Sequence, residues 1–162
     1  MNKFIDDKSL GDKAIALFND SFNCSQSVIS VYADYIGVDK NLVLNISCGF
    51  GGGMGSLQRT CGAVTAAYMV FGLLNSSECH DNQVKKAKTY MMIQSFYDSF
   101  TKIHGTTDCI DLIKCDLKTE KGQTYFKNEN LKKSVCEGCI RESVKLINKT
   151  ISENPGILYQ RG

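Results

Sequence analysis

The sequence has little of several features that mark particular classes of protein. Its 162 residues include one proline and no tryptophan, and the charges nearly balance at a net +2. With 43% hydrophobic and 22% charged residues, the composition is that of a folded protein rather than a disordered or fibrous one. A chain of this length buries roughly 70% of its unfolded surface, which gives it a core without disulfide bonds. We therefore expect a single domain over residues 1–162.

The sequence also lacks a concentrated patch of basic residues. The densest places are the pairs Lys85/Lys86 and Lys132/Lys133, which a solvated helix face explains. Nucleic-acid binding normally requires a stronger basic stripe than this. No nucleic-acid partner is expected.

Long hydrophobic runs are missing as well. The most apolar stretch, Cys61 to Leu74, has 14 residues, fewer than the ~20 that a membrane-spanning helix needs. The first residues, MNKFIDDKSLGDKAIALF, carry acidic side chains from position 6 and lack the continuous apolar stretch of a secretory signal. We expect a cytoplasmic protein without a membrane partner.

Strand-like alternation never extends beyond a few residues, whereas helical spacing of apolar residues recurs along nearly the whole chain. We predict an all-α domain, a bundle of about five to seven helices around a buried central helix at about 60–74. Residues 118–133 have no clear pattern. The other predicted helices are one from Ser9, one after Asn23 that stops at Gly37, one at about 41–48, one over 81–104, one after Asp108, and one from Ser134 to about Glu153.

Eight cysteines stand out against this background. In a reducing compartment they are expected to be thiols, metal ligands or redox groups rather than structural disulfides. A thiol in the first turn of a helix meets unpaired backbone N–H groups and the positive end of the helix dipole. Both favour the thiolate, which attacks disulfides or binds metal. The cysteines predicted at such helix starts, each on a core-facing side, are Cys24, Cys61, Cys109 and Cys136.

The remaining cysteines, Cys48, Cys79, Cys115 and Cys139, do not share this placement and are expected to be buried or incidental thiols. Cys139 also forms a CxxC pair with Cys136, an arrangement found in dithiol oxidoreductases and in metal sites. That pair supplies the catalytic candidates if the protein exchanges thiols and disulfides without a metal. His80 and His104 are expected at the surface or at a helix end rather than as ligands.

Residues 47–64, SCGFGGGMGSLQRTCGAV, contain a dense run of glycines. The run does not match the dinucleotide fingerprint, because Met54 stands where the third glycine belongs, and it lacks the G-K-[ST] of a P-loop. Glycines let the backbone approach another group closely with exposed N–H groups, which suits cluster sulfurs or a bound anion; a plain turn is the alternative. The cofactor-binding candidates are Gly51, Gly52, Gly53 and Gly55.

The segments FNCSQSV, GFGGGMG and TCGAVTAAYMVFGL, a cysteine before IDLI and another before the last helix are similar to the C-GCAxxG-C-C family. The likeness runs from about Phe22 to Ile147, although Ala66 replaces a glycine of the family motif. The resemblance implies a small helical protein suspected of redox activity, with an iron-sulfur or other metal centre and no established reaction. By position, the four cysteines for which the family is named match Cys24, Cys61, Cys109 and Cys136.

The leading hypothesis is a redox-active protein that binds an iron-sulfur cluster through these four cysteines, since four thiolates are the usual ligand count. The same count fits a tetrahedral zinc site in a structural or interaction protein. A metal-free thiol-disulfide oxidoreductase using Cys136 and Cys139 is the other alternative. The sequence leaves open whether the chain is an enzyme or an electron-transfer component, which redox partner protein it meets, and whether it forms a homo-oligomer.

Overall fold

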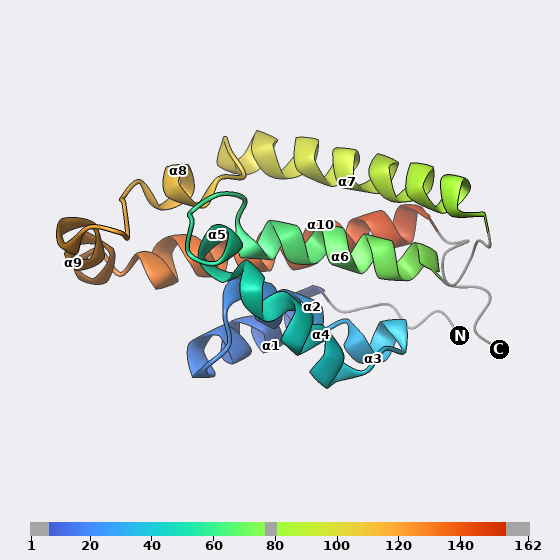
Figure 1. Cartoon of the computed structure of the whole chain (residues 1–162), viewed down its shortest axis with the longest axis horizontal. Coiled ribbons are helices and arrows are strands. Elements are labelled where there is room, and N and C mark those ends of the chain that lie inside the picture. The colour runs from blue at the N-terminus through green and yellow to red at the C-terminus, as the bar shows by residue number, and fades with distance from the viewer. Residues whose placement is uncertain (1–6, 77–80, 155–162) are drawn as a thin grey trace.

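The computed structural model describes residues 7–76 and 81–154 (Figure 1). These residues form an all-α domain, as predicted, and none of them belongs to a β-strand. Two helices occupy the middle of the molecule, with one long helix on one side and four shorter ones on the other. The middle helices are α6 (Gly62–Ser76) and α10 (Glu137–Glu153), the long one is α7 (Asn82–His104), and the others are α1 (Asp7–Asp20), α2 (Cys24–Ser30), α3 (Ala33–Ile36) and α4 (Lys40–Ser47).

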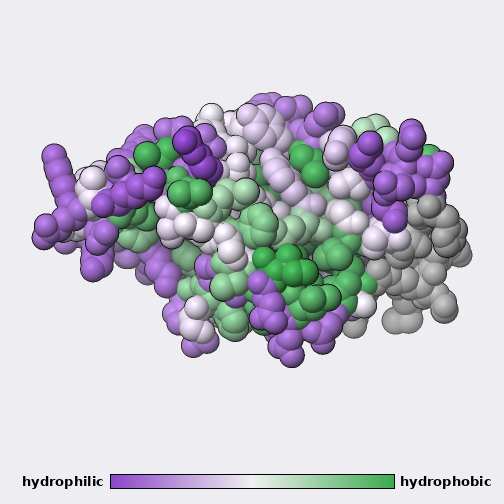
Figure 2. All heavy atoms as spheres, viewed as in Figure 1, coloured by the Kyte–Doolittle hydropathy of each residue, from purple (hydrophilic) through white to green (hydrophobic). Residues whose placement is uncertain are grey.

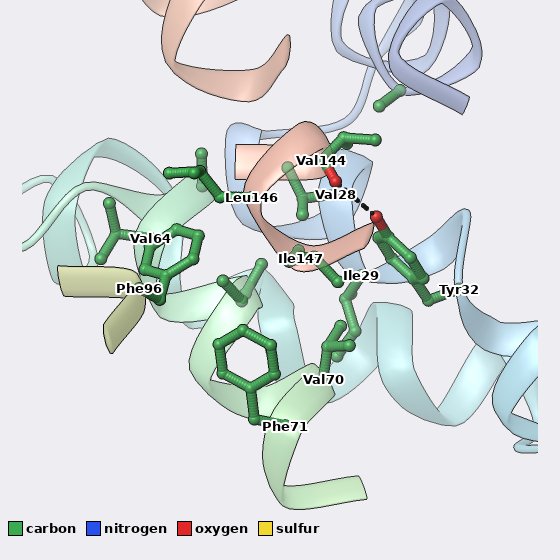
Figure 3. Packing of buried hydrophobic residues seen from close by; sticks show 14 of the residues in the cluster. Val28, Ile29, Tyr32, Val64, Val70, Phe71, Phe96, Val144, Leu146 and Ile147 are labelled. Atoms are coloured by element: carbon green, nitrogen blue, oxygen red, sulfur yellow. Dashed lines mark hydrogen bonds between the residues drawn. The ribbon is translucent and has the colours of Figure 1, made fainter. Parts of the chain in front are cut away.

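Helix α6 is the centre of the core, as the sequence predicts, and packs against α2, α7 and α10. Figure 3 shows apolar side chains from all four helices gathered around it. The Phe96 ring of α7 lies between Phe71, at a centroid distance of 5.8 Å, and Phe100, at 5.9 Å. Because each fully buried side chain of this size contributes about 1.5–3 kcal/mol, this cluster is a main source of stability.

Several helix ends lie where the sequence predicts them. Asn23 and Gln26 form a complete capping box at α2, with the Asn23 side chain accepting from the Gln26 N–H at 3.0 Å and Gln26 accepting from the Asn23 N–H at 3.1 Å. Asp81 caps α7 by accepting from the Gln83 N–H at 2.7 Å. Gly105 ends that helix with a φ of +81°, a conformation that glycine adopts without strain.

Four helix predictions were wrong. α1 begins at Asp7 rather than Ser9. The single helix predicted after Asn23 and ending at Gly37 is two helices, α2 (Cys24–Ser30) and α3 (Ala33–Ile36). Helix α9 (Glu120–Asn128) occupies the segment that has no clear pattern, because the Thr119 hydroxyl caps it, accepting from the Gly122 N–H at 3.0 Å. Ser134 does not begin the last helix, because its hydroxyl donates to the Asn130 carbonyl at 3.2 Å from inside a helical turn. That turn is the π-helix η2 (Lys132–Cys136), which continues directly into α10.

None of the helices in the described residues is both long enough and apolar enough to cross a membrane. In Figure 2, hydrophilic residues gather at the ends and along the edge of the molecule, and an apolar area lies over α4. Leu42 and Ile46 of this helix are each 55% exposed, because α4 packs on the core through Val43 and Ser47 instead.

Tyr32 offers a test of this packing. Its ring is fully buried, and its hydroxyl donates to the Asn148 side-chain oxygen at 2.8 Å, with the Val144 carbonyl at 3.0 Å. The Tyr32→Phe variant should therefore lose about 1–2 kcal/mol of unfolding free energy in a urea titration. Tyr97→Phe, at a position 46% exposed, should change it by less than about 0.5 kcal/mol. Equal losses of unfolding free energy in the two variants would contradict the buried, hydrogen-bonded position of Tyr32.

Candidate functional site

Four separate parts of the chain meet at the N-terminal end of α6. They are the start of α2, the glycine segment with α5 (Gly51–Met54), α8 (Cys109–Ile113), and η2 with the start of α10. Figure 1 shows α5 and α8 together at this end of the bundle. We call the cysteines of these parts the cysteine site: Cys24, Cys61, Cys109, Cys115, Cys136 and Cys139.

Three thiols of the cysteine site interact in sequence: the Cys61 thiol interacts with those of both Cys24 and Cys139. We call these three the thiol row. Cys24 is half-buried, Cys61 is 8% exposed and Cys139 is 2% exposed, so the row runs from the site's edge into the core. Cys139 was expected to be incidental. The sequence feature that could have identified Cys139 is its spacing of three residues from Cys136, because residues three apart lie on the same face of a helix.

The other thiols lie beside this thiol row. After burial, Cys24, Cys109 and Cys115 contribute to raising the pKa of Cys136, and Cys24 and Cys115 contribute to raising that of Cys109. The structure thus places the four predicted ligands at the same end of the bundle. It adds Cys139 to them, with the half-buried Cys115 at the margin.

Only two of the four cysteines actually begin a helix, Cys24 in α2 and Cys109 in α8. Cys61 precedes α6 as its cap, and its carbonyl accepts from the Val64 and Thr65 N–H groups, each at 3.0 Å. Cys136 lies within continuous helix, at the end of the π-helical turn. The predicted first-turn placement of Cys61 and Cys136 was therefore wrong. A π-turn is rare and often marks a functional site, and this one leads directly into the CxxC pair.

The expectation of stabilised thiolates was also wrong. Burial raises the pKa of Cys109 to about 11 and that of Cys136 to about 12. The hydrogen bond with Cys61 and then burial raise the pKa of Cys24, and the hydrogen bond with Cys139 raises that of Cys61. A helix dipole contributes only about 0.3–1 kcal/mol, less than the cost of burying an unpaired charge. Without metal, these thiols are therefore neutral.

The glycines pack directly against the cysteine-bearing elements. A methyl group on Gly62 would contact the Cys24 sulfur and lie 2.9 Å from the Phe50 carbonyl oxygen. Gly53 has a φ of +70°, and a methyl group there would lie 2.7 Å from the Cys109 β-carbon. Gly62 is thus the residue that lets α6 approach Cys24.

The predicted glycine candidates have different environments. The N–H group of Gly52 donates to the Cys24 sulfur. A methyl group on Gly51 would lie 2.5 Å from the Asn23 side chain, so this glycine makes room for the cap of α2. Gly55, with a φ of +65°, ends α5 and forms a turn.

Gln58 holds the glycine segment against the segment that carries Cys109 and Cys115. It is 2% exposed, its side-chain amide donates to the Cys115 carbonyl at 2.8 Å, and its side-chain oxygen accepts from the Leu117 N–H at 2.8 Å. Nearby, the Cys109 N–H donates to the Arg59 carbonyl at 2.7 Å. No sequence signal predicted this role, because glutamine is usually a surface residue.

The remaining candidates lie apart or outside the described residues. Cys48 is exposed. Cys79 and His80 fall outside the described residues. His104 is at the end of α7, as predicted, with its ring 4.4 Å from that of Phe100, and burial lowers its pKa.

Within residues 7–76 and 81–154, no three His, Cys, Asp or Glu side chains are placed to hold a metal ion together. Metal binding by Cys24, Cys61, Cys109 and Cys136 stays a prediction.

Alkylation of the metal-free protein tests the protonation of these thiols. The thiolate is the reactive form, and at pH 8 a thiol with a pKa of about 11 is roughly 0.1% ionised. Iodoacetamide should therefore modify the exposed Cys48 first. The rate at Cys109 should rise about tenfold for each pH unit up to about 11. Peptide mass spectrometry measures the alkylation rate at each cysteine. Equal alkylation rates at Cys48, Cys109 and Cys136 at pH 8 would contradict the raised pKa values.

Comparison with known proteins agrees with the resemblance seen in the sequence. Residues 22–150 match the family described as "Putative redox-active protein (C_GCAxxG_C_C)". No curated protein and no solved structure was found to match the chain. The matched range contains the whole cysteine site and most of the chain, and the chain therefore belongs to the C_GCAxxG_C_C family.

Proposed function

We propose that this chain is a redox protein that binds an iron-sulfur cluster through Cys24, Cys61, Cys109 and Cys136. The observation that carries the proposal is the meeting of thiols from four separate segments at one end of the bundle. Such a cluster, when bound, supplies one-electron transfer at a potential set by its surroundings. The match to a redox-active family agrees with this chemistry.

Backbone N–H groups of the site are suited to hold thiolates. Gly52 and Gly62 donate to the Cys24 sulfur, and Ala63 donates to the Cys61 sulfur. Gly62 and Ala63 begin α6, where N–H groups have no partner within the helix. Hydrogen bonds to ionised sulfur are stronger than those to a neutral thiol, so these groups would offset the negative charge that metal ligation creates.

Four thiolates suit a single zinc ion as well as an iron-sulfur cluster. The description of the matched family favours the cluster, because zinc does not change its oxidation state.

The geometry gives less support to disulfide exchange through Cys136 and Cys139. The attacking cysteine of a CxxC oxidoreductase typically has a lowered pKa at a helix start. Cys136 instead lies within a continuous helix, and burial raises its pKa to about 12, although Lys132 acts in the opposite direction.

Protection mapping tests the ligand set. Metal-free protein is reconstituted anaerobically with ferrous iron and sulfide, or with zinc, and is then alkylated at high pH. Cleavage after Lys, Arg and Glu leaves each of the eight cysteines on its own peptide. We expect iron and sulfide to protect the cysteines at 24, 61, 109 and 136 while Cys48 is modified. Protection of these cysteines by zinc but not by iron and sulfide, or protection of a different set of cysteines, would contradict the proposal.

A further inference from the structure

We propose that a second copy of this chain binds the side of the bundle formed by α4, α6 and α7, and that the two copies meet through the same face. We call this side the open face. Its residues are Leu42 and Ile46 of α4, Tyr68, Met69 and Leu73 of α6, and Tyr97 of α7. The proposal does not depend on the proposed cluster, because the open face contains no cysteine of the cysteine site.

Helix α6 is apolar on every side, yet the fold covers only part of it. It carries no charged residue and packs mainly against α2, α7 and α10. A helix without a polar face is normally buried all round. The residues of α6 that stay at least partly exposed all lie on one stripe, at 68, 69, 72, 73 and 76. A methyl group on Gly72 would meet no neighbouring atom within 4 Å, so this stripe is uncovered.

Apolar side chains continue on both sides of this stripe. Leu42 and Ile46 of α4 lie one helical turn apart, and each is 55% exposed. Toward α7, the Tyr68 ring packs edge-on against Phe96 at a centroid distance of 6.0 Å. Burial and then the neighbouring Tyr97, itself 46% exposed, raise the pKa of Tyr68 to about 12. In Figure 2 the apolar area over α4 continues in green and pale colours toward α6, so the open face spans neighbouring helices.

The charge of the open face favours a copy of this chain over another partner. Residues 41–58 contain no Asp, Glu, Lys, Arg or His, and neither does α6. Two copies of an uncharged face can therefore oppose each other without bringing like charges together. Interfaces between identical subunits are also richer in apolar side chains and poorer in charged ones than other interfaces. A transient partner protein is usually steered by complementary charges, which these side chains do not offer.

The test is the mass of the assembly in solution. Full-length protein is purified without oxygen and kept with a dithiol, so that the exposed Cys48 cannot crosslink two copies. Sedimentation velocity is then recorded over a range of protein concentrations. We expect a monomer and a dimer in equilibrium and no larger assembly, because two identical faces close on each other. Hydrogen exchange at the backbone of α4 should slow as the dimer forms.

Two variants place a charge in the open face. Leu42→Glu and Ile46→Glu are each expected to raise the dissociation constant of the dimer at least tenfold, because the carboxylate enters the interface twice and loses water there. Both side chains are exposed in the single chain, so circular dichroism should show normal folding.

Ile103→Glu is the matched control, because Ile103 is 53% exposed and the variant adds the same charge. It is the penultimate residue of α7, and that end of α7 lies beside α8, away from α4 (Figure 1). This variant should dimerise as wild type does. Equal weakening by Ile103→Glu would overturn the proposal, since dimerisation would then depend on net charge rather than on the open face.

A chain that sediments as a monomer at every concentration would overturn the proposal, and so would assemblies that grow beyond two copies. Flotation with vesicles of phosphatidylcholine and phosphatidylserine tests a membrane as the occupant of the open face. Vesicle binding by a monomeric chain, abolished in Ile46→Glu, would overturn the dimer as well. Metal-free protein is measured in parallel and is expected to dimerise in the same way, so the dimer and the proposed cluster fail separately.

Discussion

Replacing any one of Cys24, Cys61, Cys109 or Cys136 with serine is expected to lower bound iron per chain at least tenfold. A serine hydroxyl does not ionise at neutral pH, so it cannot replace a thiolate ligand. Disturbing only an outer-shell partner of a metal already costs about 10–100-fold in affinity, and loss of a ligand should cost at least as much. The measurement is iron and sulfide per chain after anaerobic reconstitution, with folding checked by circular dichroism.

Two control variants sharpen this prediction. Cys48→Ser removes an exposed thiol away from the cysteine site and should leave iron content unchanged. Cys139→Ser removes a thiol that contacts Cys61 but is not a proposed ligand, and it should retain iron. Equal losses in all of these variants would show that the four cysteines are not a distinct ligand set.

The second large effect is expected at Gly62. The Gly62→Ala variant should lose about 2–3 kcal/mol of unfolding free energy, because the added methyl group meets the Cys24 sulfur and lies 2.9 Å from the Phe50 carbonyl oxygen. Gly72→Ala is the matched control in the same helix. No atom lies within 4 Å of its added methyl group, so helix propensity should stabilise the protein by up to about 1 kcal/mol.

The change in unfolding free energy of each glycine variant is measured by urea unfolding of metal-free protein. Changes of opposite sign in the two variants would support the close approach of α6 to Cys24. A neutral or stabilising Gly62→Ala would contradict it. The Gly62→Ala variant should also bind less iron, because its methyl group displaces a proposed ligand.

Much of the fold could be predicted because its signals are local. The capping box at Asn23 and Gln26, the cap at Asp81 and the glycine at 105 each act within one helical turn. The buried helix was recognisable because it carries no charged residue. The start of the last helix was misplaced, because Ser134 matches a capping sequence and yet donates to Asn130 inside the π-helical turn that precedes α10.

The site could be predicted only in part, because its contacts join distant segments. Helix starts and the family pattern selected the four cysteines that the structure brings together. Neither could show that Cys139 contacts Cys61, nor that Gln58 ties the glycine segment to Leu117. The sign of the pKa shifts was missed for a similar reason, since burial depends on the whole fold whereas the helix dipole acts locally.

The most direct test of the central claim is the metal content of protein purified without oxygen. Iron, acid-labile sulfide and zinc are measured per chain, together with the visible absorption spectrum. The account predicts a brown protein that contains iron and sulfide in comparable amounts. A colourless protein that contains zinc would contradict it, as would a protein that stays free of iron and sulfide after anaerobic reconstitution.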